Sequence, residues 1–299
     1  MTLPDAVRRS VEQRVGPVRT PSPVAGGSIS QAVRVEVDGR PVFLKHDPSA
    51  PPGFFAAEAL GLDALRAVSG APRIPHVLAV HDTVDAGGGR EPSWLLLEWL
   101  EPDARTREFG ERLGRALAAL HAPAAGGWGW SDANFIGALP QDNVPAATWA
   151  ELWRARRLQP QLRLARDRGR MPGDGAWWDR LFAALPDALV PAEAEGPSLV
   201  HGDLWSGNVL CTTGGKPALV DPAVYRGHRE VDLAMAELFG GFDARFHAAY
   251  REARPLADGY GAVRRPIYQL YYLLVHVNLL GGGYVAQTEA VLRSALAEL

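Results

Sequence analysis

Cysteine is nearly absent from this chain, and so are long apolar runs. Cys211 is the single cysteine among 299 residues, so no disulfide can form within the chain and an oxidising compartment is not indicated. No apolar stretch reaches the roughly 18 to 20 residues that span a bilayer. The first residues also lack a basic region followed by an apolar one, which argues against a signal peptide. We therefore expect a soluble, cytoplasmic protein with no membrane partner.

A strong net charge is missing as well. With 31 basic and 34 acidic residues, no field would draw the whole molecule to nucleic acid, so no nucleic-acid partner is expected. The 47% of hydrophobic residues suffice for a substantial core, and the length allows one large domain or two lobes. The oligomeric state stays open, with a monomer as one alternative.

What the chain does contain is a short polar segment with the spacing of a phosphotransferase catalytic loop. Asp203 is followed five positions later by Asn208, and Asp221 comes thirteen residues after that. Kinase-like enzymes need an Asp that takes the proton of the substrate hydroxyl, an Asn five positions on that holds magnesium, and a second carboxylate on the metal. We predict Asp203 as the general base, and Asn208 and Asp221 as Mg2+ ligands.

Two short apolar runs between these metal ligands predict a β-hairpin. The runs at 208–211 and 218–221 flank a polar, glycine-containing stretch, which is a hairpin signal. Such a hairpin would bring Asn208 and Asp221 close together. Asp and Asn beside Gly are also ordinary turn formers, so an isolated motif of this kind would indicate only loops.

The first hundred residues predict a small sheet that could hold a nucleotide. A helix is expected over 1–20, followed by strands at 33–37 and 42–45 that are joined by a turn at 38–39. Gly26 and Gly27 precede the first of these strands, where a missing Cβ lets the backbone approach a phosphate. The structural alternative is a glycine pair at a strand bend.

Lys45 and Glu58 are the candidates for holding the nucleotide phosphates. Lys45 ends the returning strand, and Glu58 lies on a helix expected over 53–68. A lysine on the third strand paired with a glutamate on the next helix positions the phosphates in kinase-like folds. A lysine at the solvated end of a strand and a glutamate on a solvated helix face are the alternatives.

A buried strand over 94–100 has the character of a kinase hinge. The backbone of Glu98, Trp99 and Leu100 would then read the adenine edge, although a plain central strand has the same pattern. Longer helical patterns dominate after this point. We place the lobe boundary there, with a nucleotide-binding lobe at 1–100 and a catalytic, acceptor-binding lobe at 101–299.

Several residues of the second lobe allow both a structural and a functional interpretation. Its tryptophans could line a sugar or aromatic-amine pocket or could pack in the core. Asp232 could contact substrate, or it could cap a helix or brace the catalytic loop. His228 could contact substrate or form a structural hydrogen bond. The apolar run 267–280 predicts a buried helix.

With these features together, the chain closely resembles the fructosamine kinase family, also called ketosamine or fructosamine-3-kinases. The resemblance covers nearly the whole chain, and the stretches after Asp221 are its most distinctive part. The matching positions are 26–30, 45, 58, 134–137, 141, 143, 201–208, 221–235 and 237–242. The resemblance implies an α+β, bilobal protein-kinase-like fold, with a small antiparallel-sheet N-lobe and a larger, mostly helical C-lobe.

The resemblance also implies an activity: ATP-dependent, magnesium-assisted phosphorylation of a sugar hydroxyl, at O3, of ketosamines such as ribulosamines or fructosamines. The acceptors would be small ketosamines or glycated proteins, and the role would be deglycation and protein repair. Ser28 joins Gly26 and Gly27 in the implied nucleotide loop. Many plant and animal relatives carry cysteine where this chain has Ser28, so a thiol switch there is unavailable.

Two other functions remain as alternatives. A small-molecule kinase of the aminoglycoside or choline phosphotransferase type would share the catalytic loop, but the sequence after Asp221 favours the ketosamine group. A pseudokinase that binds nucleotide as an interaction module would not need the base, metal ligands and phosphate lysine that this chain retains.

Overall fold

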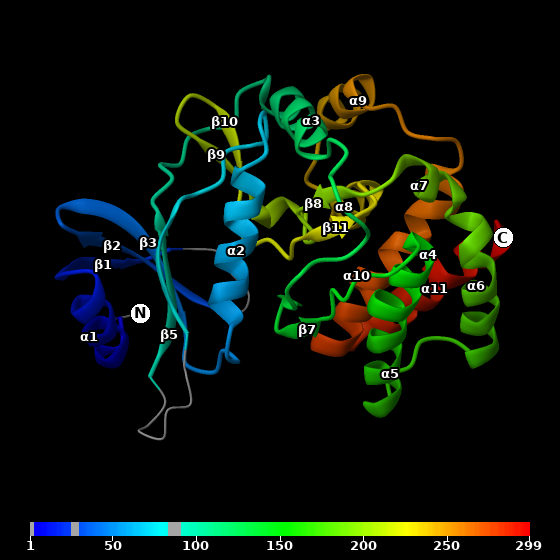
Figure 1. Ribbon diagram of the computed structural model, residues 1–299, viewed down its shortest axis with the longest axis horizontal. Coiled ribbons are helices and arrows are strands. Elements are labelled where there is room, and N and C mark those ends of the chain that lie inside the picture. The colour runs from blue at the N-terminus through cyan, green and yellow to red at the C-terminus, as the bar shows by residue number, and fades with distance from the viewer. Residues whose placement is uncertain (1–2, 25–29, 83–90) are drawn as a thin grey trace. The chain divides into compact units, whose positions relative to one another are not determined.

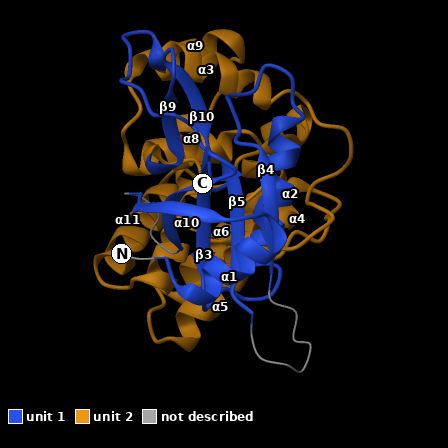
Figure 2. Cartoon of the chain, turned by 90° about the vertical axis from the view of Figure 1, so that its left-hand side faces the viewer, with its two compact units in different colours: residues 1–109, 207–222 blue, residues 110–206, 223–299 orange. Residues whose placement is uncertain are grey.

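The computed structural model describes residues 3–24, 30–82 and 91–299. The chain forms two compact units, each built from two segments of the sequence (Figure 2). Unit 1 comprises residues 1–109 and 207–222, and unit 2 comprises residues 110–206 and 223–299. Unit 1 contains a five-stranded sheet, whereas unit 2 is mostly helical. The predicted α+β class is confirmed.

The sheet of unit 1 is antiparallel, with the strand order β1-β2-β3-β5-β4. Its turn between β2 and β3 has φ values of 50° at Asp38 and 73° at Gly39. Two consecutive positive φ angles are the signature of the tight hairpin that this residue pair favours. The strands are β1 (Val18–Pro23), β2 (Gln31–Val37), β3 (Arg40–Asp47), β4 (Val77–His81) and β5 (Ser93–Glu98).

Two helices lie on opposite faces of this sheet (Figure 1). Helix α1 (Asp5–Arg14) buries Val7 and Val11 against the strands. Helix α2 (Phe54–Arg66) buries an apolar face that includes Leu62 and Leu65. The helix expected over 1–20 is wrong in length, since Gly16 adopts a φ of 137°, a conformation that ends the helix, and β1 begins at Val18.

The predicted hairpin between the metal-ligand candidates is present and belongs to unit 1. Strands β9 (Val209–Thr212) and β10 (Lys216–Leu219) pair antiparallel after a 3-10 turn at Ser206–Asn208. Isolated bridges join Ala218 to Arg73 and Thr212 to Pro102. Because of these backbone contacts, residues 207–222 pack with the first unit. The lobe boundary placed near residue 100 from the sequence assigns these residues to the second lobe instead.

Unit 2 consists of helices and two short strand pairs. The strand pairs are β6 (Asn134–Ile136) with β7 (Leu139–Gln141), and β8 (Ser198–Val200) with β11 (Tyr225–Gly227). The helices are α3 (Phe109–Leu120, which starts at the last residue of the first segment of unit 1), α4 (Trp149–Leu152), α5 (Gln159–Asp167), α6 (Gly175–Ala188), α7 (Val190–Glu195), α8 (Glu230–Phe239), α9 (Ala244–Ala253), α10 (Arg265–Leu279) and α11 (Gly283–Ala297). Two π-helical stretches lie at Trp153–Leu158 and Tyr260–Arg264.

Helix α10 is the centre of this unit and packs against α5, α8 and α11 (Figure 1). The predicted buried helix over 267–280 is confirmed, because α10 buries eleven of its residues. Trp149 and Trp153 are fully buried beside it, with ring centroids 5.3 Å apart. These tryptophans are therefore core residues rather than the lining of a ligand site. Over the described ranges, none of the helices combines the length and apolar character that crossing a membrane requires.

Helix α3 approaches α9 so closely that we predict a strong effect of one methyl group. A Cβ at Gly114 would lie 2.4 Å from the carbonyl oxygen of Phe246. We expect Gly114→Ala to lower the free energy of unfolding by about 1–3 kcal/mol, because the two helix backbones must separate. Gly283→Ala is the matched control, since nothing lies within 4 Å of its Cβ position, and we expect it to raise stability by up to about 1 kcal/mol. Urea unfolding of both variants measures this, and equal effects would contradict it.

Candidate active site

The centre of unit 1 holds a lysine between two carboxylates. The Nζ of Lys45 lies 2.9 and 2.8 Å from the two carboxylate oxygens of Glu58 and 2.9 Å from Oδ1 of Asp221. Lys45 is 7% exposed and Glu58 8%. Neither of the alternatives, a snorkelling lysine and a solvated glutamate, is present. The structure thus brings together three residues that are up to 176 positions apart.

Each of the three residues is positioned by a different element. Lys45 lies on β3 and pairs with Leu95 of β5. Glu58 lies on α2, whose first turn is fixed because the carboxylate of Asp82 accepts hydrogen bonds from the backbone N–H groups of Phe55 and Ala56. Asp221 follows β10 at the end of the hairpin.

The burial of this cluster shifts the pKa values of two of its members. Burial opposes the charge of Lys45, but the adjacent carboxylates of Asp221 and Glu58 outweigh it and raise the pKa of the ammonium above its usual value. Burial raises the pKa of Glu58 to about 7, against the opposing attraction of Lys45. The site therefore keeps its lysine charged throughout the physiological range.

Asn208 and Asp221 lie side by side at the base of the hairpin. The Nδ2 of Asn208 donates to the backbone carbonyl of Asp221 at 3.4 Å, and the backbone carbonyl of Asn208 accepts from the N–H of Val220 at 3.1 Å. Asp221 has a φ of 56°, a left-handed conformation that Asp tolerates better than most residues. An amide and a carboxylate oxygen suit magnesium, which is held by few protein oxygens together with substrate phosphates.

The segment around Asp203 is fixed within unit 2 by a buried carboxylate. Asp232 accepts hydrogen bonds from the backbone N–H groups of His201 at 2.7 Å and Gly202 at 2.8 Å. The carbonyl of Gly202 accepts in turn from the hydroxyl of Tyr272 at 3.0 Å. Of the alternatives for Asp232, the structure shows the brace, because its carboxylate is fully buried and binds the backbone of residues 201–202 rather than substrate or a helix N-terminus.

Gly202 is required at its position by both conformation and space. Its φ is 83°, and a Cβ there would lie 2.1 Å from the carbonyl oxygen of Ala223. Asp203 follows, partly exposed, and its backbone N–H donates to Nδ1 of His201 at 3.3 Å. The close approach of the backbone at Gly202 to that at Ala223 therefore fixes the position of the backbone of Asp203.

A buried histidine, His121, forms a hydrogen bond with the carboxylate of Asp232, and the sequence analysis did not identify this role. The Nε2 of His121 lies 3.0 Å from Oδ2 of Asp232, and its Nδ1 lies 2.8 Å from the hydroxyl of Tyr250. Burial lowers the pKa of His121, so the ring is neutral and donates one hydrogen bond to the carboxylate. The three residues lie far apart in the sequence, and no local pattern relates them.

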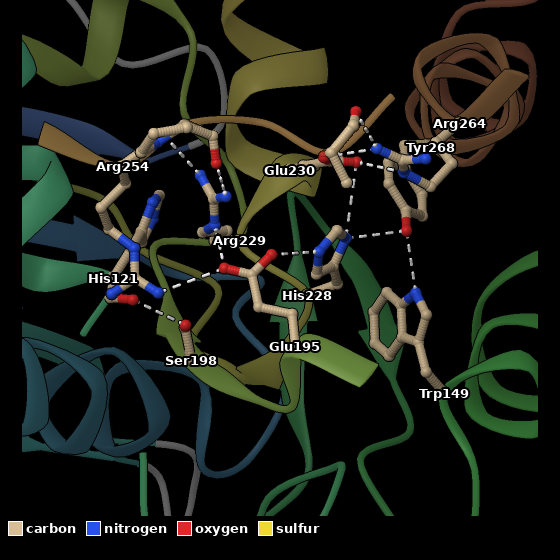
Figure 3. Close-up of polar contacts among 12 residues, drawn as sticks. His121, Trp149, Glu195, Ser198, His228, Arg229, Glu230, Arg254, Arg264 and Tyr268 are labelled. Carbon is tan, nitrogen blue, oxygen red and sulfur yellow. Dashed lines mark hydrogen bonds and ion pairs between the residues drawn. The ribbon is translucent and has the colours of Figure 1, made fainter. Parts of the chain in front are cut away.

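The charged residues that follow Asp221 in the sequence form buried contacts of their own (Figure 3). Glu195 contacts His228 at 3.1 Å, Arg254 at 3.1 Å and the guanidinium of Arg229. These contacts leave the carboxylate charged, since His228 and Arg229 lower the pKa of Glu195 although burial opposes them. His228 is 1% exposed and is therefore a structural residue rather than a substrate contact.

Glu230 forms a second buried pair beside this one (Figure 3). Both of its carboxylate oxygens accept hydrogen bonds from the guanidinium of Arg264, at 2.7 and 2.8 Å. His228 lies between the two groups, because its Nδ1 is 3.6 Å from the carboxylate of Glu230 and its Nε2 faces Glu195. The hydroxyl of Tyr268 lies 2.9 Å from the same Nδ1 and 3.0 Å from Nε1 of Trp149. The distinctive sequence after Asp221 therefore supplies a set of buried polar contacts at the start of α8, the helix that also carries Asp232.

Of the predicted hinge residues, Glu98 is the last residue of β5, and Trp99 and Leu100 follow the strand, which ends before the expected residue 100. The backbone N–H of Glu98 already donates to the carbonyl of His76 at 2.9 Å, and its carboxylate pairs with Arg73. Trp99 stacks on Phe43 with a centroid distance of 6.5 Å. Leu100 is buried, and within the described ranges its backbone N–H and C=O form no hydrogen bond. Gly26, Gly27 and Ser28 lie outside the described residues.

Comparison with known proteins gives matches over most of the chain. A family model described as fructosamine kinase matches residues 5–298. A Synechocystis protein provisionally named a ketoamine kinase is 41% identical, over 91% of this chain and 89% of its own length. A chloroplastic protein-ribulosamine 3-kinase from rice is 35% identical, over 91% of this chain and 77% of its own length.

Solved structures agree as well. A Thermobifida fusca protein provisionally named a fructosamine-3-kinase superimposes with a TM-score of 0.85 at 39% identity, covering 97% of this chain and 98% of its own. An aminoglycoside phosphotransferase in a ternary complex with AMP-PNP and hygromycin B gives a TM-score of 0.63 at 18% identity, with 97% and 98% covered. The second likeness shows the fold alone, and the predicted kinase-like fold is confirmed.

The raised pKa of Glu58 predicts a specific pH dependence of stability. In the unfolded chain this carboxyl loses its proton near pH 4.5, but in the native protein it does so near pH 7. Between these values the native state binds more protons, so its stability falls as the pH rises, by about 1.4 kcal/mol for each unit of pKa difference. We expect the free energy of unfolding of the ligand-free protein to fall over this range relative to Glu58→Gln. Urea unfolding at several pH values tests this, with exposed Glu111→Gln as the control, and parallel curves for Glu58→Gln and the wild type would contradict it.

Asp232 should be irreplaceable even by its amide. In Asp232→Asn one acceptor oxygen becomes an NH2 group that faces backbone donors, so we expect a loss of about 3 kcal/mol or more of stability. Asp243→Asn is the matched control, because Asp243 caps α9 by accepting from the N–H of Phe246 at 2.9 Å and Asn caps equally well. Chemical unfolding of both variants measures the difference. A loss at Asp232 as small as that at Asp243 would exclude the bracing role.

Proposed function

The chain belongs to the fructosamine kinase family, and we propose that it transfers the γ-phosphoryl group of ATP to a sugar hydroxyl of a ketosamine, at O3. A ketosamine is the rearranged product of a reducing sugar and an amine. Ribulosamines and fructosamines on small amines or on protein lysines are the proposed acceptors. The observation that carries this proposal is the buried cluster in which Lys45 contacts both Glu58 and Asp221.

The nucleotide is assigned to residues of unit 1. Lys45, held by Glu58, would bind the nucleotide phosphates, since its ammonium stays protonated and its orientation is fixed by two carboxylates. The backbone of Leu100 would contact the adenine edge, beside Glu98 and Trp99, and the loop with Gly26, Gly27 and Ser28 would cover the phosphates. Residues 1–100 thus supply the proposed nucleotide-binding lobe.

Magnesium would be held by Asn208 and Asp221. When bound, the ion neutralises charge on the nucleotide phosphates. The residues fit it, because one oxygen of the Asp221 carboxylate pairs with Lys45 at 2.9 Å while the other has no hydrogen-bond partner within the described ranges. The left-handed backbone of Asp221 is held by the Val220 to Asn208 hydrogen bond, so the position of this carboxylate is fixed before any ligand arrives.

Asp203 would act as the general base. As the sugar oxygen bonds to the γ-phosphorus, the bond from phosphorus to the bridging oxygen breaks, ADP leaves, and the hydroxyl proton passes to the carboxylate of Asp203. Positioning by a preformed loop is the larger part of such catalysis, and Asp232 with Gly202 provides it here. Phosphorylation would make the adduct labile, which gives the enzyme a repair role in the cytoplasm.

A panel of acceptors tests this proposal together with the base. Ribulosamines, erythrulosamines and fructosamines on free amino acids, and a glycated protein, are incubated with ATP and magnesium, and the phosphorylated product is quantified. We expect turnover by the wild type, and Asp203→Asn should lower kcat by roughly 10² to 10⁴ while ATP still binds.

Asp167→Asn is the matched control, since Asp167 is exposed at the end of α5, and it should keep wild-type turnover. Full turnover by Asp203→Asn would exclude that residue as the base. Turnover of aminoglycosides or amino alcohols in place of every ketosamine would reject the proposed acceptor class, and ATP consumption with none of them would indicate a nucleotide-binding module.

A further inference from the structure

His276 is a partly exposed histidine with one ring nitrogen occupied and the other available. It lies in the last turns of α10, and its Nδ1 lies 2.8 Å from the backbone carbonyl of Tyr272. A carbonyl oxygen only accepts, so Nδ1 carries the proton and donates it there. Nε2 forms no hydrogen bond to any of the described residues. In the neutral ring this nitrogen is an acceptor.

Two aromatic side chains hold the His276 ring in place. The ring centroid of Phe239, at the end of α8, lies 4.8 Å from it, and that of Tyr284, in the first turn of α11, also lies 4.8 Å from it. Phe239 is 37% exposed, and His276 and Tyr284 are partly exposed. Three elements of unit 2 thus place a row of rings at the surface with the imidazole in the middle.

This row is close to the loop that carries Asp203. Tyr272, whose hydroxyl donates to the carbonyl of Gly202, is one helical turn before His276 on the same face of α10, about 6 Å along the axis. Ser206 lies so close to Gly241 that a Cβ there would be 2.5 Å from the Ser206 Cβ. The end of α8 and the middle of α10 therefore flank residues 202–206.

A ligand at this position must bring a hydrogen-bond donor and can bring a positive charge. Burial lowers the pKa of His276, so its ring is neutral near pH 7 and does not repel a cation. The faces of Phe239 and Tyr284 carry the negative side of the aromatic quadrupole, which attracts ammonium groups. A sugar hydroxyl would satisfy only the acceptor nitrogen, whereas a protonated amine satisfies both the nitrogen and the rings.

We propose that Nε2 of His276, between Phe239 and Tyr284, accepts a hydrogen bond from the protonated secondary amine of the ketosamine acceptor. This inference rests on the proposed function and specifies how its acceptor is distinguished from a plain sugar. The amine is the one feature that every ketosamine has and that a free ketose lacks. His276 is thus a binding residue for the amine, one helical turn from the contact of α10 with the catalytic loop.

The test compares two acceptors with two variants. The acceptors are a small ketosamine and its N-acetyl derivative, in which the nitrogen carries neither charge nor hydrogen. His276→Asn can keep the donor to the Tyr272 carbonyl but loses the acceptor at Nε2. His276→Gln can place an acceptor near the Nε2 position but loses the donor to Tyr272. We expect wild-type kcat/KM to favour the ketosamine, and His276→Asn to reduce this preference by about ten- to a hundredfold, the range for a hydrogen bond to a charged group.

The two variants separate binding from structure. His276→Gln should retain part of the preference for the ketosamine even if thermal unfolding shows it to be the less stable protein. The KM for ATP should be unchanged in both. An unchanged ketosamine preference in His276→Asn, with the wild type active, would overturn this inference alone. Absence of turnover of every ketosamine by the wild type would overturn the proposed function and this inference with it.

Discussion

The buried ammonium of Lys45 is the interaction on which the rest of unit 1 depends. A charged lysine with 7% exposure is stable only if nearby carboxylates replace the water it has lost. Glu58 and Asp221 do so from a helix and from the end of a hairpin. Because both must reach the same nitrogen, the positions of β3, α2 and the hairpin are coupled. The same coupling fixes Asp221, the residue proposed to hold magnesium.

In unit 2 a buried negative charge, the carboxylate of Asp232, holds separate segments of the chain together. The carboxylate of Asp232 has no exposed surface. It accepts hydrogen bonds from two backbone N–H groups of the loop that precedes Asp203 and from the ring of neutral His121. The half-buried carboxylate of Glu195 and the fully buried one of Glu230 are likewise matched by arginines. In each unit, a segment proposed to act in catalysis is thus held by a buried ion with all its partners in place. This arrangement suits phosphoryl transfer, in which positioning and electrostatics dominate.

The features that sequence analysis identified correctly are those encoded by local spacing. The hairpin between Asn208 and Asp221 follows from two apolar runs around a turn, and the Asp38-Gly39 turn from its own dipeptide. Lys45 and Glu58 required the kinase pattern in addition, because each has an ordinary surface interpretation by itself. The pairs Glu195 with Arg254 and His121 with Asp232 are 59 and 111 positions apart. No periodicity relates such residues, so only the fold reveals them. Nothing in the sequence indicated the role proposed for His276 either. That role depends on the hydrogen bond of Nδ1 to the backbone carbonyl of Tyr272, which leaves Nε2 as the acceptor.

The two-segment composition of unit 1 has a consequence for how the chain is made. Residues 1–109 emerge from the ribosome first, yet the hairpin that belongs with them follows only after 97 further residues, 110–206. Until residue 222 has been synthesised, Lys45 has only one of its two carboxylates, and closing the intervening segment carries the entropy cost of a long loop. Unit 1 therefore cannot mature as an independent N-terminal domain. Its completion has to wait for much of the helical unit, and sequence-distant contacts of this kind slow folding.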